Sequence, residues 1–259
     1  MTTPAAAAPV ENPYGLMAAL EQGGLIAWAT FLILVAMSVF TFYIMFTKLF
    51  EQQKIMNQGR RVRASFWNAA NIREGGAKLE KNSAYRQIVE DGLIAQEQHT
   101  KLTDPVDQHE WMLNSLQRSQ AMVGNKLGEG LAFLASVGST APFIGLFGTV
   151  VGIYRALIKI GAAGQASIDA VAGPVGEALI MTALGLVVAV PAVLGYNWLM
   201  RRNKAIMDSL GAFSTDLHGY MMSGGAVKPA QVGKNAAAVA AAKTAPAAAT
   251  TAPAGTVKR

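Results

Sequence analysis

The chain has 259 residues, of which 52% are hydrophobic, 15% are charged and none is cysteine. An average soluble domain is about a quarter charged, so this composition argues against an ordinary soluble protein. The missing cysteine excludes disulfides, iron–sulfur clusters and thiol catalysis. The formal net charge is +6, but no basic patch with interleaved aromatic residues is present, so we expect no nucleic-acid partner.

The N-terminal part of the chain contains a first apolar segment. Residues 1–23 are rich in Ala and Pro at first, and residues 14–20 have the pattern of an interfacial helix. Leu25–Phe46 then gives 22 residues without a charge, and about 20 suffice to cross the hydrocarbon core. No Lys or Arg precedes this segment, and signal peptides have shorter apolar cores of about 7–15 residues. We therefore predict a retained membrane anchor.

The next segment differs sharply in composition. Residues 47–130 contain 12 basic and 10 acidic residues, mixed in sequence, which predicts a water-exposed helical domain. The apolar spacing within residues 83–98 indicates one amphipathic helix. From Pro105, which suits a first helical turn, the pattern continues without a strong break. We predict a single long helix over residues 105–158 that enters the membrane.

Two further apolar segments are long enough to span a membrane. Leu131–Tyr154 has 24 uncharged residues and Ala178–Met200 has 23. The connection between them is short and rich in Gly and Ala, which predicts an antiparallel hairpin. A turn centred near Gln165 would bring Thr149 and Thr182 to the same depth.

Small residues recur along both helices of this hairpin at offsets of three and four. Such stripes allow helices to approach closely in lipid, and by themselves they predict helix packing. The prolines inside the hairpin predict kinks. The packing residues are Gly145, Gly148, Gly152, Gly185 and Ala178, and the prolines are Pro142 and Pro191.

Glu177 stands at the head of the third apolar segment. A charge that faces lipid is costly, and intramembrane carboxylates normally face a polar interior. The alternative is that Glu177 reaches the membrane interface. Thr149 and Thr182 also have a simpler interpretation, since a hydroxyl in a helix often bonds the carbonyl one turn earlier.

Basic residues set the expected orientation. They follow the first span, beginning with Lys48 and Lys54, and the third span, beginning with Arg201 and Arg202, whereas the N-terminal segment has none. Because Lys and Arg concentrate on the cytoplasmic side, we predict a periplasmic N-terminus and a cytoplasmic C-terminus.

These observations divide an all-α, polytopic membrane protein into successive segments. They are a periplasmic N-terminal segment (1–23), transmembrane helix 1 (24–47), a cytoplasmic helical domain (48–130), transmembrane helix 2 (131–156), a periplasmic loop (157–173), transmembrane helix 3 (174–200), a cytoplasmic helix (201–223) and a disordered Ala/Pro-rich tail (224–259).

Two stretches resemble a known family. "PFIGLFGTVVGIY" (Pro142–Tyr154) and "GPVGEALIMTALGLVVAVPAV" (Gly173–Val193) are similar to the signature helices of the ExbB/TolQ/MotA proton-channel family. Three spans with a large cytoplasmic segment resemble ExbB and TolQ, while MotA has four, and the Ala/Pro-rich extensions favour ExbB. Two departures are "AGPVGEAL" in place of "APGIAEAL" and Arg155, where relatives usually carry an uncharged residue.

The resemblance implies a function and partners. Family members form a homo-oligomer, a pentamer, in the bacterial inner membrane, and its lumen holds the helices of an ExbD-like single-span partner with a titratable aspartate. Proton flow is then coupled through a TonB-like protein to uptake of iron chelates and vitamin B12 across the outer membrane. By the same resemblance, Thr149 and Thr182 would lie beside that aspartate and Glu177 would line the lumen nearby.

Two other functions are compatible with the same sequence, and a third is not expected. A TolQ-like subunit of the Tol–Pal envelope-maintenance motor and a non-conducting membrane scaffold both remain open. An enzyme is not expected, because no nucleophile–base pair, cofactor motif or metal spacing is present, and "GLFGTVVG" follows no strand as a nucleotide loop would. We expect no cofactor and no metal, and membrane lipid as the surroundings.

Overall fold

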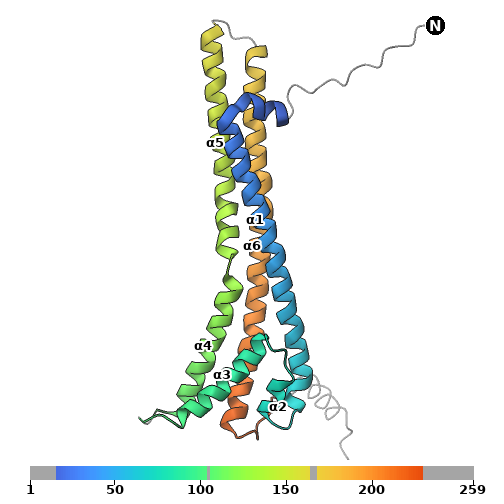
Figure 1. Cartoon of the computed structure of the whole chain (residues 1–259), viewed down its shortest axis with the longest axis vertical. Helices are drawn as coiled ribbons and strands as arrows, with labels where there is room; N and C mark the ends of the chain where they lie inside the picture. Colours follow the sequence, from blue (N-terminus) through green and yellow to red (C-terminus); the bar gives the residue numbers. More distant parts are fainter. Residues whose placement is uncertain (1–15, 104–105, 164–167, 230–259) are drawn as a thin grey trace, which may run out of the picture.

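The computed structural model describes residues 16–103, 106–163 and 168–229. Within these ranges the regular structure is helical and contains no strand. The predicted all-α class is therefore confirmed. The molecule is an elongated bundle in which three long helices run side by side (Figure 1).

The three long helices are α1 (Leu16–Ser65), α5 (Leu131–Ala163) and α6 (Ile168–Met222). Each contains an apolar stretch that is long enough to cross a membrane, by length and composition. These stretches agree with the three predicted spans. α5 and α6 form the antiparallel hairpin, and α1 packs against both.

α1 is bent near its start. Gly24 has φ 59° and ψ −153°, so the helical path is interrupted there. A positive φ is readily adopted by glycine, which has no Cβ. The segment before the bend leans across the hairpin at one end of the bundle (Figure 1). The interfacial helix predicted for residues 14–20 falls partly outside the described residues.

The helix predicted over residues 105–158 is in fact two helices, and that prediction was wrong. α4 (Gln108–Gly128) ends before α5 begins at Leu131. Gly130 between them has φ 79°, which lies outside the range of a right-handed α-helix and therefore interrupts the helix. Continuous apolar spacing did not reveal this break.

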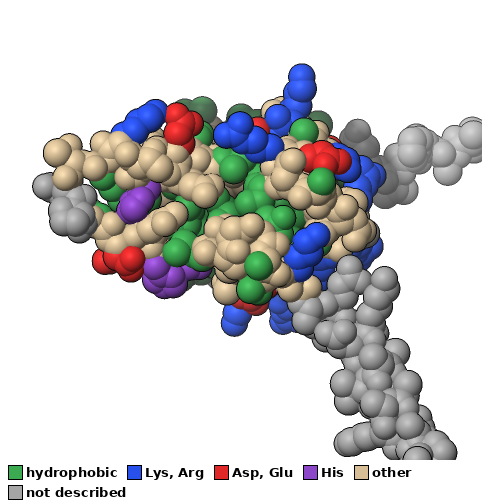
Figure 2. All heavy atoms as spheres, turned by 90° about the horizontal axis from the view of Figure 1, so that it is seen from below, with side chains coloured by type: hydrophobic (Ala, Val, Ile, Leu, Met, Phe, Trp, Pro, Cys, Tyr) green, Lys and Arg blue, Asp and Glu red, His purple; other side chains and the backbone are tan. Residues whose placement is uncertain are grey.

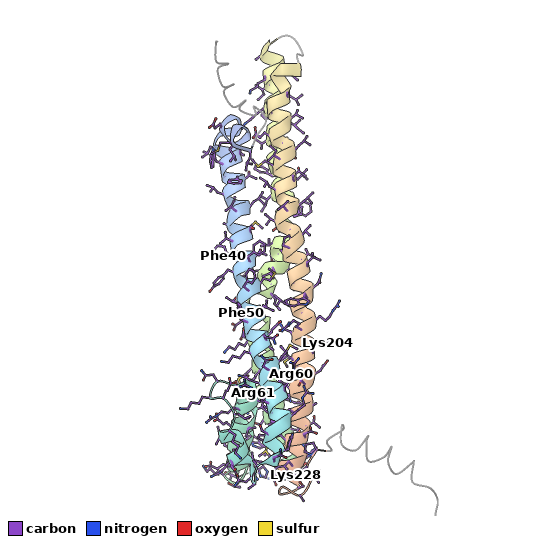
Figure 3. The ribbon with its side chains drawn as sticks, turned by 90° about the vertical axis from the view of Figure 1, so that its right-hand side faces the viewer. Phe40, Phe50, Arg60, Arg61, Lys204 and Lys228 are labelled. Carbon is purple, nitrogen blue, oxygen red and sulfur yellow. The ribbon has the colours of Figure 1, made fainter. Side chains whose placement is uncertain are left out.

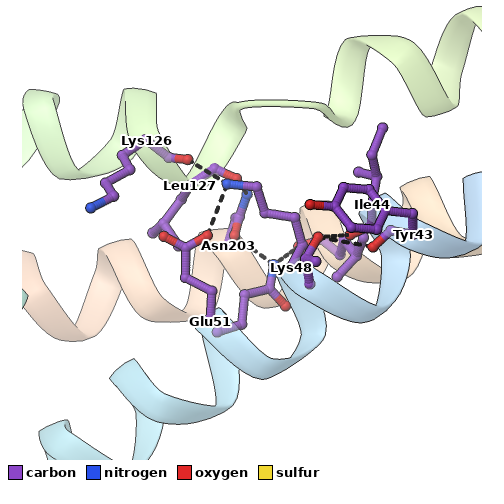
Figure 4. A network of polar contacts seen from close by, with 10 residues as sticks. Tyr43, Ile44, Lys48, Glu51, Lys126, Leu127 and Asn203 are labelled. Carbon is purple, nitrogen blue, oxygen red and sulfur yellow. Dashed lines mark hydrogen bonds and ion pairs between the residues drawn. The ribbon is translucent and has the colours of Figure 1, made fainter. Parts of the chain in front are cut away.

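Buried polar side chains from α1 and α6 satisfy the carbonyls that the break leaves free (Figure 4). Lys48 Nζ donates to the Lys126 carbonyl at 2.8 Å, and Asn203 Nδ2 donates to the Leu127 carbonyl at 2.9 Å. Gln52 Nε2 in turn donates to Asn203 Oδ1 at 2.6 Å. The network stabilises the end of α4 because unpaired terminal carbonyls are costly when buried.

A large apolar core lies at the lower end of the bundle (Figure 1). The short elements η1 (Phe66–Asn68) and α2 (Ile72–Ala77) and the longer α3 (Ala84–His99) lie there. α3 packs against α1, α4 and α6, η1 packs against α1, and α2 packs against η1 and α3. α3 confirms the helix predicted for residues 83–98. Its buried residues Tyr85, Ile88 and Val89 belong to one large apolar cluster.

The segment predicted as a loop, residues 157–173, is largely helical. α5 continues to Ala163 and α6 begins at Ile168, so both helices extend past the apolar windows. The limits of the membrane stay a prediction, as do the other segment boundaries. Of the predicted tail, residues 230–259 lie outside the described residues.

The surface changes character along the bundle. Phe40 and Phe50 point away from α1, with 56% and 71% of their surface exposed, and Arg60, Arg61 and Lys204 follow further down (Figure 3). The lower end shows Lys and Arg side chains around a partly apolar surface (Figure 2). This order, aromatic and then basic, is typical of a helix that leaves a bilayer through the membrane–water interface.

Candidate functional site

The three polar residues singled out from the sequence lie on the α5–α6 hairpin. Thr149 belongs to α5, and Glu177 and Thr182 belong to α6. The two helices run antiparallel in the upper half of the bundle, with the start of α1 beside them (Figure 1). The site is therefore formed by three helices, of which the sequence had indicated two.

Glycines allow α5 and α6 to approach closely. A Cβ at Gly145 would lie 2.6 Å from the Met181 carbonyl oxygen and 3.1 Å from the Gly185 Cα. A Cβ at Gly152 would lie 3.1 Å from the Pro174 carbonyl oxygen. At Gly145 an added Cβ would force the backbone of α6 to move, and at Gly152 it would require a small shift of the neighbouring atoms.

The other small residues predicted for packing meet at the same interface. A Cβ at Gly148 would lie 2.9 Å from the Met181 Cβ, and Ala178 Cβ would be 3.2 Å from a Cβ at Gly152. The structure thus places the whole stripe between α5 and α6 of one chain. A role in lining a pore stays a prediction.

The two threonines lie at similar depth, as the hairpin geometry suggested. Gly148 faces Met181, and the next residue on each helix is Thr149 and Thr182. Thr149 is buried, and its hydroxyl donates to the Leu146 carbonyl at 2.6 Å. Thr182 is half-buried, and in the described part of the chain no hydrogen bond joins the two hydroxyls.

Glu177 is enclosed by its own chain. Only 3% of its surface is exposed. Its Oε1 lies 3.9 Å from Arg155 Nη1 on α5, and a Cβ at Gly23 on α1 would overlap the same oxygen. The carboxylate therefore points toward α1 and α5 rather than to the surface, which argues against the interfacial interpretation.

Three neighbours of the site were not predicted. Arg155 stands out in the sequence only as a departure from the family pattern, although a cation in an intramembrane hairpin requires a partner. Gly23 carried no signal that it lies against a carboxylate. Thr30 of α1 is 3% exposed, and its Cγ2 would be 3.4 Å from a Cβ at Gly148, which adds a third hydroxyl at the level of Thr149.

The two prolines of the pattern are half-buried within continuous helices, Pro142 in α5 and Pro191 in α6. Their effect on helix direction stays a prediction. Across the residues that the structure describes, no group of three or more His, Cys, Asp or Glu is arranged to hold a metal ion.

Comparison with known proteins gives the class of protein. The MotA/TolQ/ExbB proton channel family matches residues 80–211, a range that contains α3, α4 and α5 and most of α6. The chain belongs to this family.

The individual relatives narrow the class. The chain is 38% identical over 213 residues to "Biopolymer transport protein ExbB" of Xanthomonas campestris pv. campestris (strain B100), covering 78% of this chain and 84% of that protein. It is 35% identical to the ExbB protein of Neisseria meningitidis serogroup A over 76% and 93% of the two chains. "Tol-Pal system protein TolQ" of Haemophilus influenzae is 31% identical over 76% and 91%.

These relatives support an ExbB-like role, and the TolQ proteins are more distant. The family and the three apolar helices together support a multi-pass protein of the inner membrane. The relatives carry the names of transport and Tol–Pal system proteins rather than of enzymes.

Proposed function

We propose that this chain is the ExbB-type subunit of an inner-membrane motor that uses the proton-motive force to energise a TonB-like protein. Outer-membrane uptake of iron chelates and vitamin B12 is the process that the motor drives. The proton path passes Glu177, Thr149 and Thr182. The observation that carries the proposal is the buried carboxylate of Glu177, 3% exposed within the apolar hairpin of a proton-channel family.

The chemistry of the site supports this role. A bare proton cannot cross hydrocarbon, so it needs titratable or hydrogen-bonding groups along its way. Glu177 is titratable, and the hydroxyls of Thr149 and Thr182 both donate and accept hydrogen bonds. They can therefore stabilise either charge state of a partner's carboxyl group.

The partners follow from the family and from the surface of the chain. We propose a homo-oligomer, a pentamer, around the helices of an ExbD-like single-span protein, with a TonB-like protein as the third component. Large apolar side chains on α5 and α6 remain exposed in the single chain, among them Phe143, Phe147, Leu179, Val187 and Leu194. Lipid and neighbouring copies would cover such faces.

The proposed orientation places the N-terminus in the periplasm and the C-terminus in the cytoplasm. Its support is the aromatic-to-basic order along α1, from Phe40 and Phe50 to Arg60 and Arg61 (Figure 3). Reporter fusions after residues 90 and 225 should be cytoplasmic. A periplasmic reporter at residue 90 would contradict the arrangement.

The test of the proton path pairs assembly with activity. Glu177→Gln removes the titratable group at nearly constant volume, and the Thr149→Val/Thr182→Val double variant removes both hydroxyls. Each variant complex should assemble with its partner as wild type does, yet growth on chelated iron should be strongly reduced. The controls are Glu21→Gln and Thr140→Val, since both of these residues are exposed.

The alternatives predict other outcomes. A non-conducting scaffold would lose activity only in proportion to lost assembly. If the chain is instead a TolQ-like subunit, the variants should leave iron uptake intact and weaken the cell envelope, seen as sensitivity to detergent. Wild-type growth of the Glu177→Gln and double-Thr strains with full assembly and an intact envelope would remove these residues from the proton path.

A further inference from the structure

Arg155 connects the three helices of the site. Its guanidinium donates a hydrogen bond to the Gly23 carbonyl of α1. The same Nη1 lies 3.9 Å from Glu177 Oε1 of α6. The Arg155 side chain is 28% exposed while that of Glu177 is 3% exposed, so the cation lies at the rim and the carboxylate inside.

The bend of α1 makes the Gly23 carbonyl available. Because Gly24 is not helical, the segment Leu16–Gly23 ends there and its last carbonyls lose their helical partners. A cation at the C-terminal end of a helix bonds these carbonyls and interacts favourably with the helix dipole. Arg155 is therefore placed by the backbone of α1 as well as by α5.

Gly23 also provides the space for the carboxylate. A Cβ at this position would overlap Glu177 Oε1 and come within 2.6 Å of its carboxyl carbon. The glycine thus allows α6 to bring Glu177 against the backbone of α1, within reach of Arg155.

We propose that Arg155 is a positioning residue for Glu177: held on the Gly23 carbonyl, it fixes the place of the carboxylate at the outer end of the bundle and supplies its countercharge. The pairing of Arg155 with Glu177 does not depend on the proposed function. Only its consequence for proton transport rests on that function. A buried carboxylate needs a partner charge or hydrogen bonds, and of the described groups Arg155 is the one within ion-pair distance. Through Arg155, the protonation of Glu177 depends on α1 and α5 as well as on α6.

The pairing is tested by a double-mutant cycle on the full chain in its complex. Arg155→Gln should lower the midpoint temperature of unfolding by about 2–4 °C in the wild-type background. It should lower it by less than half as much in the Glu177→Gln background, because interacting residues are not additive. Additive effects within error would overturn the pairing.

A second readout separates charge positioning from packing. The infrared carbonyl band of the protonated Glu177 carboxyl group, identified by its loss in Glu177→Gln, gives the pH at which this group titrates. Arg155→Gln should displace that midpoint by about one pH unit or more, since an opposite charge within about 4–6 Å has effects of this size. Arg155→Lys, which keeps the charge, should restore most of the wild-type midpoint.

Two matched controls sharpen the result. Lys159→Gln removes an exposed cation one turn further along α5 and should displace the midpoint by less than half as much as Arg155→Gln. Gly23→Ala should displace it through the overlap with the carboxylate, whereas Gly176→Ala, which adds a methyl group in open space, should not. An unchanged midpoint in both Arg155→Gln and Gly23→Ala would overturn the assignment.

Failure of this inference and failure of the proposed function are distinguishable. The unfolding cycle and the infrared midpoint report on Glu177 directly and require no proton transport. If Glu177→Gln keeps energised growth, the proton path falls while the pairing can stand. If Glu177→Gln abolishes growth and Arg155→Gln changes neither readout, the pairing falls alone.

Discussion

The two ends of the bundle are held together in different ways. At the hairpin end, α5 and α6 meet through glycines, as at Gly145 and Gly185, where a single added Cβ would strike the opposite backbone. At the other end, large side chains form one cluster in which the rings of Phe66 and Tyr85 each lie 5.2 Å from that of Phe213. The two kinds of packing match two different surroundings. Water drives apolar side chains together, whereas in lipid close packing is the main attraction between helices.

The buried polar groups at the two ends of the bundle also differ in how they are held. Near the apolar-to-polar transition, Lys48, Gln52 and Asn203 form a network that completes the broken end of α4 (Figure 4). At the hairpin end, the charged group within ion-pair distance of Glu177, among the residues that the structure describes, is Arg155 at 3.9 Å. The first arrangement fixes structure through several hydrogen bonds, whereas the second holds one buried carboxyl group beside a single cation at 3.9 Å.

The largest expected effect lies in the large apolar cluster. Met112 of α4 is fully buried there, and its neighbour Leu113 is 38% exposed. Met112→Ala should cost about 2–5 kcal/mol of the free energy of unfolding, because it leaves a cavity. Thermal unfolding or hydrogen exchange of α4 would measure the loss, and Leu113→Ala should cost much less. Equal costs would mean that this end is not held by its core.

A smaller effect is expected at the glycine interface. Gly145→Ala places a methyl group 2.6 Å from the Met181 carbonyl oxygen, and overpacking of this kind costs about 1–3 kcal/mol. The midpoint temperature of unfolding and the assembled fraction measured by native mass spectrometry should both fall. Gly161→Ala on the same helix, where nothing lies within 4 Å, serves as the control. An unchanged Gly145→Ala complex would show that close approach of α5 and α6 is not what holds the hairpin.

The smallest effect is expected in the polar network. Gln52 is fully buried and donates to Asn203 and to the Leu199 carbonyl, whereas the adjacent Gln53 is exposed. Gln52→Ala should cost about 1–2 kcal/mol, since it removes two hydrogen bonds with a usual net contribution of about 1 kcal/mol each, and it should increase proteolysis near residue 129. Gln53→Ala should do neither, and a matching loss in both variants would contradict the role of the network.

The sequence was sufficient for the parts of the fold that depend on composition and local pattern. Uncharged windows predicted the three spans, and spacing of apolar residues predicted α3. The spacing of small residues at offsets of three and four predicted close helix packing, and in the structure these residues lie between α5 and α6. Hairpin geometry predicted Thr149 and Thr182 at similar depth, and the contact between the preceding positions, Gly148 and Met181, supports this prediction.

The breaks and the polar contacts could not be predicted in this way. Gly24 and Gly130 are two of 26 glycines, and only tertiary contacts decide which of them adopts a positive φ. The Lys48 and Asn203 bonds that stabilise the break after α4 join residues far apart in the chain. Arg155 was visible as an anomaly, but its partners, Gly23 and Glu177, become neighbours only once α1 bends across the hairpin.

Proton transport by Glu177 can be measured as proton flux through the complex. The purified complex with its ExbD-like partner would be reconstituted in liposomes containing a pH-sensitive dye, and a pH gradient would be imposed. The account predicts flux above that of empty liposomes for wild type and for the exposed control Glu21→Gln, and flux at the empty-liposome level for a fully assembled Glu177→Gln complex. Wild-type flux through the Glu177→Gln complex would contradict the account.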